Sequence, residues 1–388
     1  MDKHLKKISA RLKSLVKNRD LNQSILIVGK DGIGKFKLVM ETAAALLCDS
    51  QAACGKCFGC KNVRKLQHPD FLFVFPFPRI KPESRKNTVF TFSDPVSSNA
   101  RYSDDTRDEI DNYISSRLEN PFAIVDFEKK ENIPVEVIKD LILALSKKPL
   151  LGGRRVVAIL NVDKMAFGAA DLFLKVVEEP PDDTHIILTT ANPDQLMPTL
   201  LSRTDILKVP PAGIEDMEKY LIKKLEVPEN QVAYLARMSG GSPGRALYLA
   251  QCDLPGRRDI IYSFFEKLLT RGKLSELIEE TGREYSGGSY SVGDIRLDFE
   301  IMESIIHDLF LLNENQLDNH FINVDIKDKL GKWEIPEIES LEIWKGCCSE
   351  VRKACLVNNV SVNSAMTFFY ISCADSIDNP VRVRMKLP

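Results

Sequence analysis

The sequence predicts an α/β domain built on a parallel sheet, followed by two helical domains. Apolar runs rich in β-branched residues alternate with helical segments over the first 209 residues, as in folds whose parallel sheet is covered on both faces. After KVPP (208–211) no clear strand pattern is evident, and the rest of the chain has helical periodicity. We therefore expect an α/β domain at 1–209, a small helical domain at 210–255 and a helical C-terminal domain at 256–388.

Four apolar segments are the expected strands of the first domain. Each is short, rich in Val, Ile, Leu and Phe, and bounded by turn residues, which is typical of strands buried on both faces. These segments are SILIVG (24–29), HPDFLFVFPF (68–77), RRVVAILNVDKM (154–165) and THIILTTAN (184–192).

The segments between these strands have the spacing of helices. In the first of them, Leu38, Val39, Thr42, Ala43 and Leu46 fall on one side of a helix, and the last is stopped by two prolines. The expected helices are KFKLVMETAAALLC (35–48), PVEVIKDLILALSKK (134–148) and AFGAADLFLKVVEEPP (166–181). Residues 78–120 are polar without a clear period, so we expect an insertion there that is partly helical near 104–118.

Seven further segments with helical periodicity fill the two expected helical domains. They are GIEDMEKYLIKKL (213–225), ENQVAYLARMS (229–239), GGSPGRALYLAQ (240–251), RDIIYSFFEKLLT (258–270), DFEIMESIIHDLFLL (298–312), IESLEIWKGCCSEVRKACLVN (338–358) and VNSAMTFFYISCA (362–374).

Composition and charge narrow the function classes. The 388 residues carry a formal net charge of −2, so the overall charge does not indicate binding to nucleic acid. The basic start, MDKHLKKISARLKSLVKNRD, lacks the apolar stretch of a secretory signal, and no apolar run approaches the ~20 residues that span a bilayer. We expect a cytoplasmic protein, whose nine cysteines are reduced and available for metal binding or burial.

GKDGIGKF (29–36) follows the first strand and opens the first helix, as a phosphate loop does. Gly29, Gly32 and Gly34 let backbone N–H groups curl around phosphate oxygens, and Lys35 would reach the terminal phosphates. The next position should supply the hydroxyl that binds Mg²⁺, but Phe36 stands there. The other interpretation is an inherited tight turn that binds nothing.

The acidic half of an ATPase site is also incomplete. Such sites place two carboxylates at the end of a neighbouring strand, one for Mg²⁺ and one to polarise the attacking water. ILNVDKM offers Asp163 and then Lys164, so a cation stands in the position of the general base. Together with Phe36, this argues against ATP hydrolysis.

The segment CDSQAACGKCFGC predicts a zinc site. Cys48, Cys54, Cys57 and Cys60 lie within thirteen residues, and two C-x-x-C steps with a fourth thiolate suit tetrahedral Zn²⁺. No position is left for water, so we expect a structural metal; a redox pair or coincidence is the alternative. The other cysteines are expected in the helical core: Cys252, Cys347, Cys348, Cys355 and Cys373.

Two arginines stand at notable places. LLSRTDIL puts Arg203 directly after a strand and a turn, at the expected edge of the α/β domain, and GGSPGRAL puts Arg245 in the first turn of a helix. A single arginine is more often a solvated residue or part of a structural salt bridge than a functional group.

Taken in order, these segments resemble the clamp-loader branch of the AAA+ ATPases. The resemblance covers most of residues 15 to 250 and rests on the phosphate loop, the cysteine cluster, HPDF, GGRRVVAILNVDKM, VVEEPP, ILTTAN, LLSRT and GGSPGRAL. It is strongest to a subunit type of the bacterial DNA polymerase III clamp loader, which carries a four-cysteine zinc module and a degenerate ATP loop. It implies an AAA+ P-loop-type sheet domain, a helical lid and a helical collar.

The resemblance assigns roles to single positions. Residues 29–36 correspond to the Walker A loop and Asp163 to Walker B, while Thr190 or Asn192 falls near sensor 1 and Arg245 at sensor 2.

Two positions depart from the pattern of this branch. Arg203 corresponds to an arginine finger lent to a neighbouring ATPase, followed by Thr204 where the family has Cys. The gap between Cys48 and Cys54 is shorter than is usual in the family, which makes Cys48 the least certain ligand.

The resemblance implies a subunit that does not itself hydrolyse ATP and that carries structural Zn²⁺. Its partners would be clamp-loader subunits of gamma/tau and delta type, and, through the complex, the sliding clamp and primed DNA. An active ATPase of gamma/tau type is the enzymatic alternative, but it would keep Ser or Thr at position 36 and an acidic residue at 164. A zinc-dependent nucleic-acid-binding protein is the other alternative, with some support from Lys56, Lys61, Arg64 and Lys65.

Overall fold

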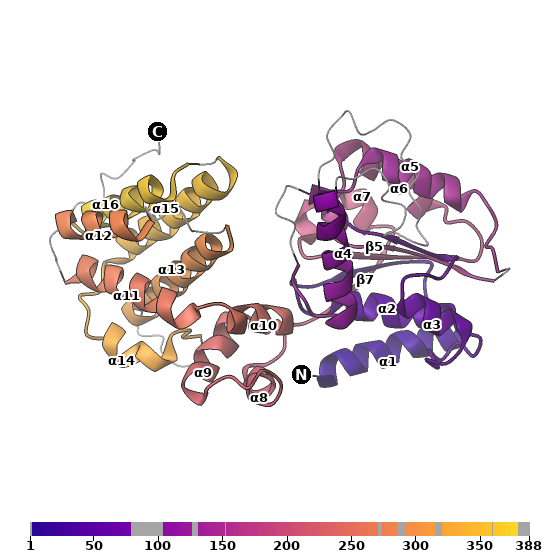
Figure 1. Cartoon of the computed structure of the whole chain (residues 1–388), viewed down its shortest axis with the longest axis horizontal. Coiled ribbons are helices and arrows are strands. Elements are labelled where there is room, and N and C mark those ends of the chain that lie inside the picture. The colour runs from indigo at the N-terminus through magenta and orange to yellow at the C-terminus, as the bar shows by residue number, and fades with distance from the viewer. Residues whose placement is uncertain are drawn as a thin grey trace. The chain divides into compact units, whose positions relative to one another are not determined.

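The computed structural model describes residues 2–78, 104–125, 131–151, 153–270, 274–285, 292–314, 320–358 and 360–378. The chain divides into two units, Met1–Tyr220 with Gly240–Tyr248, and Leu221–Ser239 with Leu249–Pro388 (Figure 1). The first unit contains the sheet and the second is helical in its described residues, which confirms the predicted fold class.

The first unit is built on a parallel sheet of five strands in the order β2-β5-β6-β1-β7. The strands are β1 (Ser24–Val28), β2 (Phe71–Val74), β5 (Arg155–Ile159), β6 (Thr184–Thr190) and β7 (Asp205–Lys208). β1 is central, with its last residue, Val28, opposite Thr190 of β6 and Lys208 of β7. Because the carboxyl ends of parallel strands share one edge, the loops after β1, β5 and β6 meet there.

Four of these strands were predicted and the fifth was not. β7 has only four residues, DILK, and three of them are exposed, so it lacks the apolar run that marks a buried strand. It lies at the sheet edge and pairs only with β1.

Helices cover both faces of this sheet (Figure 1). On one side lie α1 (Asp2–Asn18), α2 (Lys35–Leu46) and α3 (Phe58–Arg64), and on the other α5 (Val135–Leu145) and α6 (Phe167–Glu178). α2 is buried nearly all round, since it packs between α1, α3 and the strands β5 and β6. The short helices η3 (Val162–Lys164) and η4 (Pro193–Gln195) follow β5 and β6 at the carboxyl edge, and α7 (Pro198–Leu201) leads into β7.

The predicted insertion at 78–120 is described only in part, because residues 79–103 lie outside the described ranges. Its second part forms α4 (Asp104–Glu119), which confirms the helix expected near 104–118. Tyr113 of α4 stacks on Phe75, with ring centroids 4.9 Å apart, and Ile110 is fully buried. The strands β3 (Phe77–Pro78) and β4 (Glu131–Asn132), which precede and follow α4 in the sequence, pair as a two-stranded antiparallel sheet. The end of the insertion is therefore part of the core.

The described part of the second unit consists of helices. They are α9 (Glu229–Met238), α11 (Leu254–Leu269), α12 (Leu274–Tyr285), α13 (Val292–Asn313), η5 (Val324–Ile326), α14 (Lys327–Leu330), α15 (Ile338–Val357) and α16 (Val362–Asp378). α15 packs on α13 and α16 around the buried Trp344, whose Nε1–H donates to the Ser376 hydroxyl at 2.8 Å. Of the five cysteines expected in the helical core, Cys347, Cys348 and Cys373 are buried, whereas Cys252 and Cys355 are only partly buried.

Two helices lie at the division between the units. α8 (Ile214–Leu225) contains the boundary after Tyr220, and α10 (Pro243–Gln251) is assigned largely to the first unit. The predicted domain limits at 209 and 255 remain predictions. Among the described helices, none combines the length and apolar character needed to cross a membrane.

Candidate functional site

The loop between β1 and α2 has the backbone of a phosphate loop. Gly34 precedes α2 with φ of 106°, a left-handed conformation that residues with a Cβ rarely adopt. The loop therefore turns sharply from the strand into the helix, as expected from GKDGIGKF.

The lysine of this loop is directed back onto the loop itself. Lys35 Nζ donates to the carbonyl oxygens of Gly29 (2.5 Å) and Lys30 (3.1 Å) and to Oδ1 of Asp31 (3.2 Å). An ammonium has three donors, so these bonds use all of them. Burial lowers the pKa of Lys35, although the Asp31 carboxylate opposes this shift. The ammonium is thus bound by its own loop in the position where it would otherwise reach a phosphate.

Phe36 belongs to the hydrophobic core. Its side chain is buried, and its ring meets that of Phe73 edge-on, with centroids 6.0 Å apart. The position that carries a magnesium ligand in active ATP loops therefore serves here to pack α2 on the sheet.

Residues 242–244 and Phe122, which are distant from the loop in the sequence, cover it. The N–H of Gly244 donates to the Gly32 carbonyl at 3.0 Å, and the Ser242 hydroxyl donates to the Asp31 carbonyl at 2.6 Å. A Cβ on Gly244 would lie 2.7 Å from Gly32 Cα and would overlap the carbonyl oxygen of Phe122, so only glycine fits this approach.

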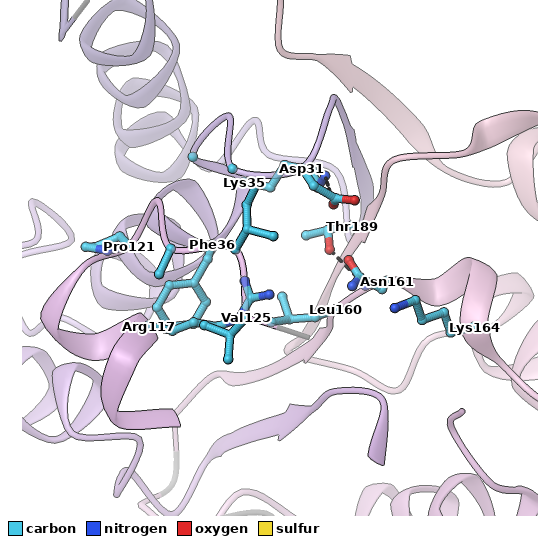
Figure 2. Close-up of a pocket in the computed structure, with 14 residues that line it drawn as sticks. Asp31, Lys35, Phe36, Arg117, Pro121, Val125, Leu160, Asn161, Lys164 and Thr189 are labelled. Carbon is cyan, nitrogen blue, oxygen red and sulfur yellow. Dashed lines mark hydrogen bonds and ion pairs between the residues drawn. The ribbon is translucent and has the colours of Figure 1, made fainter. Parts of the chain in front are cut away.

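The space left beside the loop is small. The cavity measures about 40 Å³ and is lined by the loop, by Arg117 of α4, by residues 121 and 123–125, and by Asn161 and Lys164 (Figure 2). Figure 2 shows Phe36 and Val125 on one side of it and Lys164 on the other. Sites for small molecules typically measure ~300–1,000 Å³. The cavity is therefore much smaller than a typical site for a small molecule.

The residues predicted near a γ-phosphate do meet at the carboxyl edge of the sheet. The Thr190 hydroxyl donates to Oδ1 of Asp163 at 2.6 Å, and Nδ2 of Asn192 lies 3.2 Å from Oδ2. Both carboxylate oxygens of Asp163 are thus engaged by the end of β6. Lys164 forms an ion pair with Glu131 of β4, a partner that the sequence pattern did not indicate.

The four cysteines form one cluster. The Sγ atoms of Cys48, Cys54, Cys57 and Cys60 all lie within 4.8 Å of one another, and those of Cys48 and Cys57 are 3.8 Å apart. Four thiolates bound to Zn²⁺ at ~2.3 Å form a tetrahedron with edges of about 3.8 Å. The cluster is therefore positioned to bind a metal ion, and Cys48 is part of it.

Backbone groups support the thiolates. The N–H groups of Cys54, Cys57 and Cys60 point to Sγ of Cys48, Cys54 and Cys57, at 3.4–3.5 Å. Burial disfavours the Cys48 thiolate, but hydrogen bonds from Cys54, Ser50 and Ala52 outweigh burial and lower the pKa of Cys48 to about 5. Burial raises the pKa of Cys60 to about 12, so a metal ion bound there displaces a proton. The residues fit a structural Zn²⁺, which would tie residues 48–60 together.

The two arginines have different surroundings. Arg203 lies between α7 and the edge strand β7, with Nε 2.8 Å from Oε1 of Glu178 and Nη1 3.1 Å from the Thr199 carbonyl. Arg245 lies in α10 with its guanidinium 4.9 Å from the centroid of the Tyr248 ring. Arg245 lies in the first turn of a helix, as predicted, whereas Arg203 follows the short helix α7 and not a strand. The sequence gave no signal for Glu178 as a partner of Arg203.

The sheet, the loop between strand and helix, and the Asp163–Thr190 pair together define a P-loop-type α/β protein of the AAA+ kind. The family model described as "DNA polymerase III, delta subunit" matches residues 4–213, more than half of the chain. The chain therefore belongs to this family, which confirms the predicted resemblance to a DNA polymerase III subunit.

Individual relatives agree with the family model. The chain is 25% identical over 235 residues to the DNA polymerase III subunit delta' of Escherichia coli K12, covering 60% of this chain and 55% of that protein. It is 27% identical over 248 residues to the subunit delta' of Pseudomonas aeruginosa, covering 63% and 60%. The chain thus matches less than two thirds of the length of either relative.

Among solved structures, a DNA polymerase III gamma subunit-related protein from Thermotoga maritima aligns with 96% of this chain and 99% of its own. The TM-score is 0.37 and the sequence identity is 17%.

Proposed function

We propose that the chain is a delta-prime-type subunit of a DNA polymerase III clamp loader that does not hydrolyse ATP. In DNA replication it would support ATP-driven loading of the sliding clamp onto primed DNA and lend Arg203 to a neighbouring ATPase subunit. The gamma/tau-type and delta-type subunits would be its direct partners, and the cytoplasm its location. Family membership supports the type of subunit.

The closed phosphate loop is the observation that carries this proposal. The Lys35 ammonium is bound by loop oxygens, Phe36 is in the core, and Gly244 and Ser242 bind carbonyls of the loop. For ATP to enter, these contacts must break, and the loop would still lack the hydroxyl that holds Mg²⁺. The binding free energy of a nucleotide would have to offset both losses.

The other half of the site supports the same conclusion. Hydrolysis needs a base or a group that orients the attacking water. Lys164 occupies that position and is paired with Glu131, while Asp163 accepts hydrogen bonds from Thr190 and Asn192. The Thr190 hydroxyl and the Asn192 amide, which fall near sensor 1, thus serve to hold the Asp163 carboxylate in place.

The arginine finger is the contribution we assign to this chain in ATP chemistry. Arg203 is exposed beside the edge strand of the sheet, where a neighbouring subunit could approach. A guanidinium is a permanent cation with planar donors, which suits the developing charge on a transferred phosphoryl group.

The remaining parts are assigned architectural roles. We infer an AAA+ domain at 1–209 with a zinc module at 48–60 and an insertion at 78–120, a lid at 210–255, and a collar at 256–388 that joins neighbouring subunits. The long helices α13, α15 and α16, in which α15 packs on the other two, supply the rigid body that such a collar requires.

The test is a titration of the pure, zinc-loaded chain with Mg-ATP, followed by a turnover assay and by co-purification with delta-type and gamma/tau-type subunits. We expect no binding of Mg-ATP at concentrations of about 1 mM and no hydrolysis. We expect the chain to enter the complex stably. Mg²⁺-dependent turnover that Lys35→Ala abolishes would instead identify an active gamma/tau-like ATPase. Failure to enter the complex would contradict the assignment as a clamp-loader subunit.

A further inference from the structure

Charge is distributed very unevenly along this chain. Residues 1–65 hold fourteen Lys and Arg but only five Asp and Glu, a formal charge of +9. Since the whole chain carries −2, the remaining residues carry −11. A charge difference of this size between parts of one chain is typical of a surface that binds a polyanion.

On α1 the basic residues lie on the outer side. Leu5, Leu12 and Val16 are buried against the domain, whereas Lys7, Arg11 and Lys17 are exposed. Spacing of four between residues 7 and 11 places these two cations on one face of the helix. Lys13 lies at the border of that face and pairs with Glu41 of α2 at 3.1 Å.

The cysteine module adds a second group of exposed cations. Lys56, Lys61 and Lys65 are exposed, while Cys60 and Val63 face the core. The spacing i, i+3, i+7 puts Phe58 and Lys61 of α3 in one stripe with Lys65, the residue that caps the helix. Phe58 is 59% exposed, although its ring meets that of His68 at an angle of 60°, with centroids 5.9 Å apart.

The two elements that carry these cations, α1 and α3, both pack against α2. α1 and α2 run in the same direction, since Leu5 lies beside Gly34 and the Ser9 hydroxyl and Lys13 ammonium both bind Glu41. α3 packs on the C-terminal part of α2, where the Cys60 thiol lies 3.6 Å from the Ala44 carbonyl. The C-terminal half of α1 and the module therefore meet at the same end of α2.

Few carboxylates in this part of the chain neutralise these cations. Glu41 is bound by Ser9 and Lys13, and Asp31 is bound by Lys35, which leaves Asp20 and Asp49 as exposed acids in residues 5–65. Four thiolates with one Zn²⁺ would contribute −2, so the excess of positive charge persists with the metal bound.

We infer that this basic surface, defined by Arg11, Lys17, Lys56, Lys61 and Lys65, binds single-stranded nucleic acid, with a base stacked on Phe58. Lys and Arg neutralise phosphates and release counterions. An exposed ring beside them supplies the stacking that single strands offer and that paired bases do not. The inference does not depend on the proposed clamp-loader function, because it concerns a surface of this chain alone.

A single strand fits these features better than other polyanions do. Acidic proteins and anionic lipids would satisfy the cations, but they offer no base to stack on the exposed ring beside them. A duplex would satisfy the cations as well, yet its stacked bases cannot reach Phe58.

The experiment measures binding of a fluorescent 20-nucleotide single strand to the full, zinc-loaded chain between roughly 50 and 200 mM salt. The test variant is the triple Arg11→Gln, Lys17→Gln, Lys61→Gln. Its control is Lys219→Gln, Lys223→Gln, Lys224→Gln on α8, which removes the same charge from exposed positions elsewhere. Each phosphate contact contributes ~0.7 to the salt slope for single strands, so the test triple should flatten the slope by about 2 and the control should leave it unchanged.

Phe58→Ala tests the stacked base. We expect a loss of about tenfold in single-strand affinity, with an unchanged salt slope. Phe167→Ala is the matched control, because Phe167 is also the first residue of a helix and is 89% exposed. Circular dichroism and zinc content verify that each variant is folded.

Several results would overturn the inference. They are no binding at the lowest salt, equal losses in the two lysine triples, and full affinity in Phe58→Ala. Duplex DNA, poly-glutamate or phosphatidylserine vesicles bound as tightly as the single strand would likewise show that the surface does not select single-stranded nucleic acid.

Discussion

Glu178 and Arg203 form an ion pair between the end of α6 and the turn before the edge strand, with Nε and Oε1 2.8 Å apart. Glu178 is the last residue of α6, where the helix dipole disfavours a carboxylate. Arg203 compensates that charge, and its Nη1 is held by the Thr199 carbonyl and the Ser202 hydroxyl. Both side chains are 38% exposed, so the pair itself adds at most ~1 kcal/mol to stability. The ion pair would instead serve to orient the Arg203 guanidinium.

The first prediction concerns Arg203. Arg203→Ala should fold and assemble normally, because only an exposed pair is lost, but it should depress ATP-driven clamp loading by the reconstituted complex. Arginine fingers contribute roughly 10³–10⁵ in rate in related phosphoryl transfers, and a complex whose other sites keep their fingers should lose less. Arg203→Lys should rescue poorly, since a point charge cannot replace the planar fork. Wild-type loading by Arg203→Ala would make Arg203 an ordinary surface residue.

The second prediction separates the orientation of the Arg203 guanidinium, which Glu178 would provide, from the charge of Arg203 itself. Glu178→Gln keeps the size of the side chain but loses the ion pair, so we expect a smaller decrease in loading than with Arg203→Ala and unchanged assembly. Glu179→Gln is the matched control, because Glu179 is the next residue and is exposed. Combining Glu178→Gln with Arg203→Ala should add nothing to the effect of Arg203→Ala alone. Additive losses in the double variant would mean that Glu178 acts elsewhere.

Much of the first unit could be predicted from the sequence because its signals are local. The strands β1, β2, β5 and β6 are continuous apolar runs, and the four cysteines lie within thirteen residues. Other features have no local signal. β7 is held by backbone hydrogen bonds to β1, and α12 (LSELIEETGREY) is too polar to stand out.

The closure of the phosphate loop could not be predicted for the same reason. Gly244 lies more than 200 residues from Gly32, and Glu131 lies 33 residues from Lys164. Such contacts depend on the fold bringing segments together, and single residues at these separations leave no periodic pattern. The sequence indicated that the loop is degenerate, and the structure shows which groups cover it.

The third prediction is that restoring the missing hydroxyl does not restore ATP binding. In Phe36→Ser, Lys35 remains bound to Gly29, Lys30 and Asp31, and Gly244 still covers Gly32. The variant also loses a ring buried against Phe73, at a cost of about 3–5 kcal/mol in the free energy of unfolding. Urea unfolding and Mg-ATP titration measure both effects, with Phe36→Leu as the control that keeps an apolar core. Tight Mg-ATP binding by Phe36→Ser would mean that the loop opens readily.

The fourth prediction is one tightly bound zinc per chain. Cys57→Ser should lose the metal and loosen residues 48–60, because thiolate ligation contributes folding free energy to a short loop. Cys355→Ser is the control, since Cys355 lies in α15, far from the cluster in sequence. Acidification should release zinc, as protons compete for the four thiolates. Elemental analysis that finds no zinc in the wild-type chain, or full zinc in Cys57→Ser, would refute the site.

The last prediction concerns the collar. Truncation after residue 255 should leave a folded sheet domain that no longer enters a stable complex, because the helices that would join neighbours are gone. The structure adds a second consequence. α9 precedes the cut, yet its Tyr234 ring lies 3.8 Å from the guanidinium of Arg258, which is itself held by both carboxylate oxygens of Asp325 at 2.5 and 2.7 Å.

Removing Arg258 and η5 therefore exposes a buried face of α9, including Val232, Tyr234 and Leu235. Hydrogen exchange should show fast exchange in α9 of the fragment while β1 stays protected, because β1 is hydrogen-bonded on both sides within the first unit. Arg258→Ala in the full chain is the matched control: it should loosen α9 partially and leave assembly intact. A fragment that assembles as well as the full chain would refute the collar. Unchanged protection of α9 would show that this helix is held by the lid rather than by the helices after it.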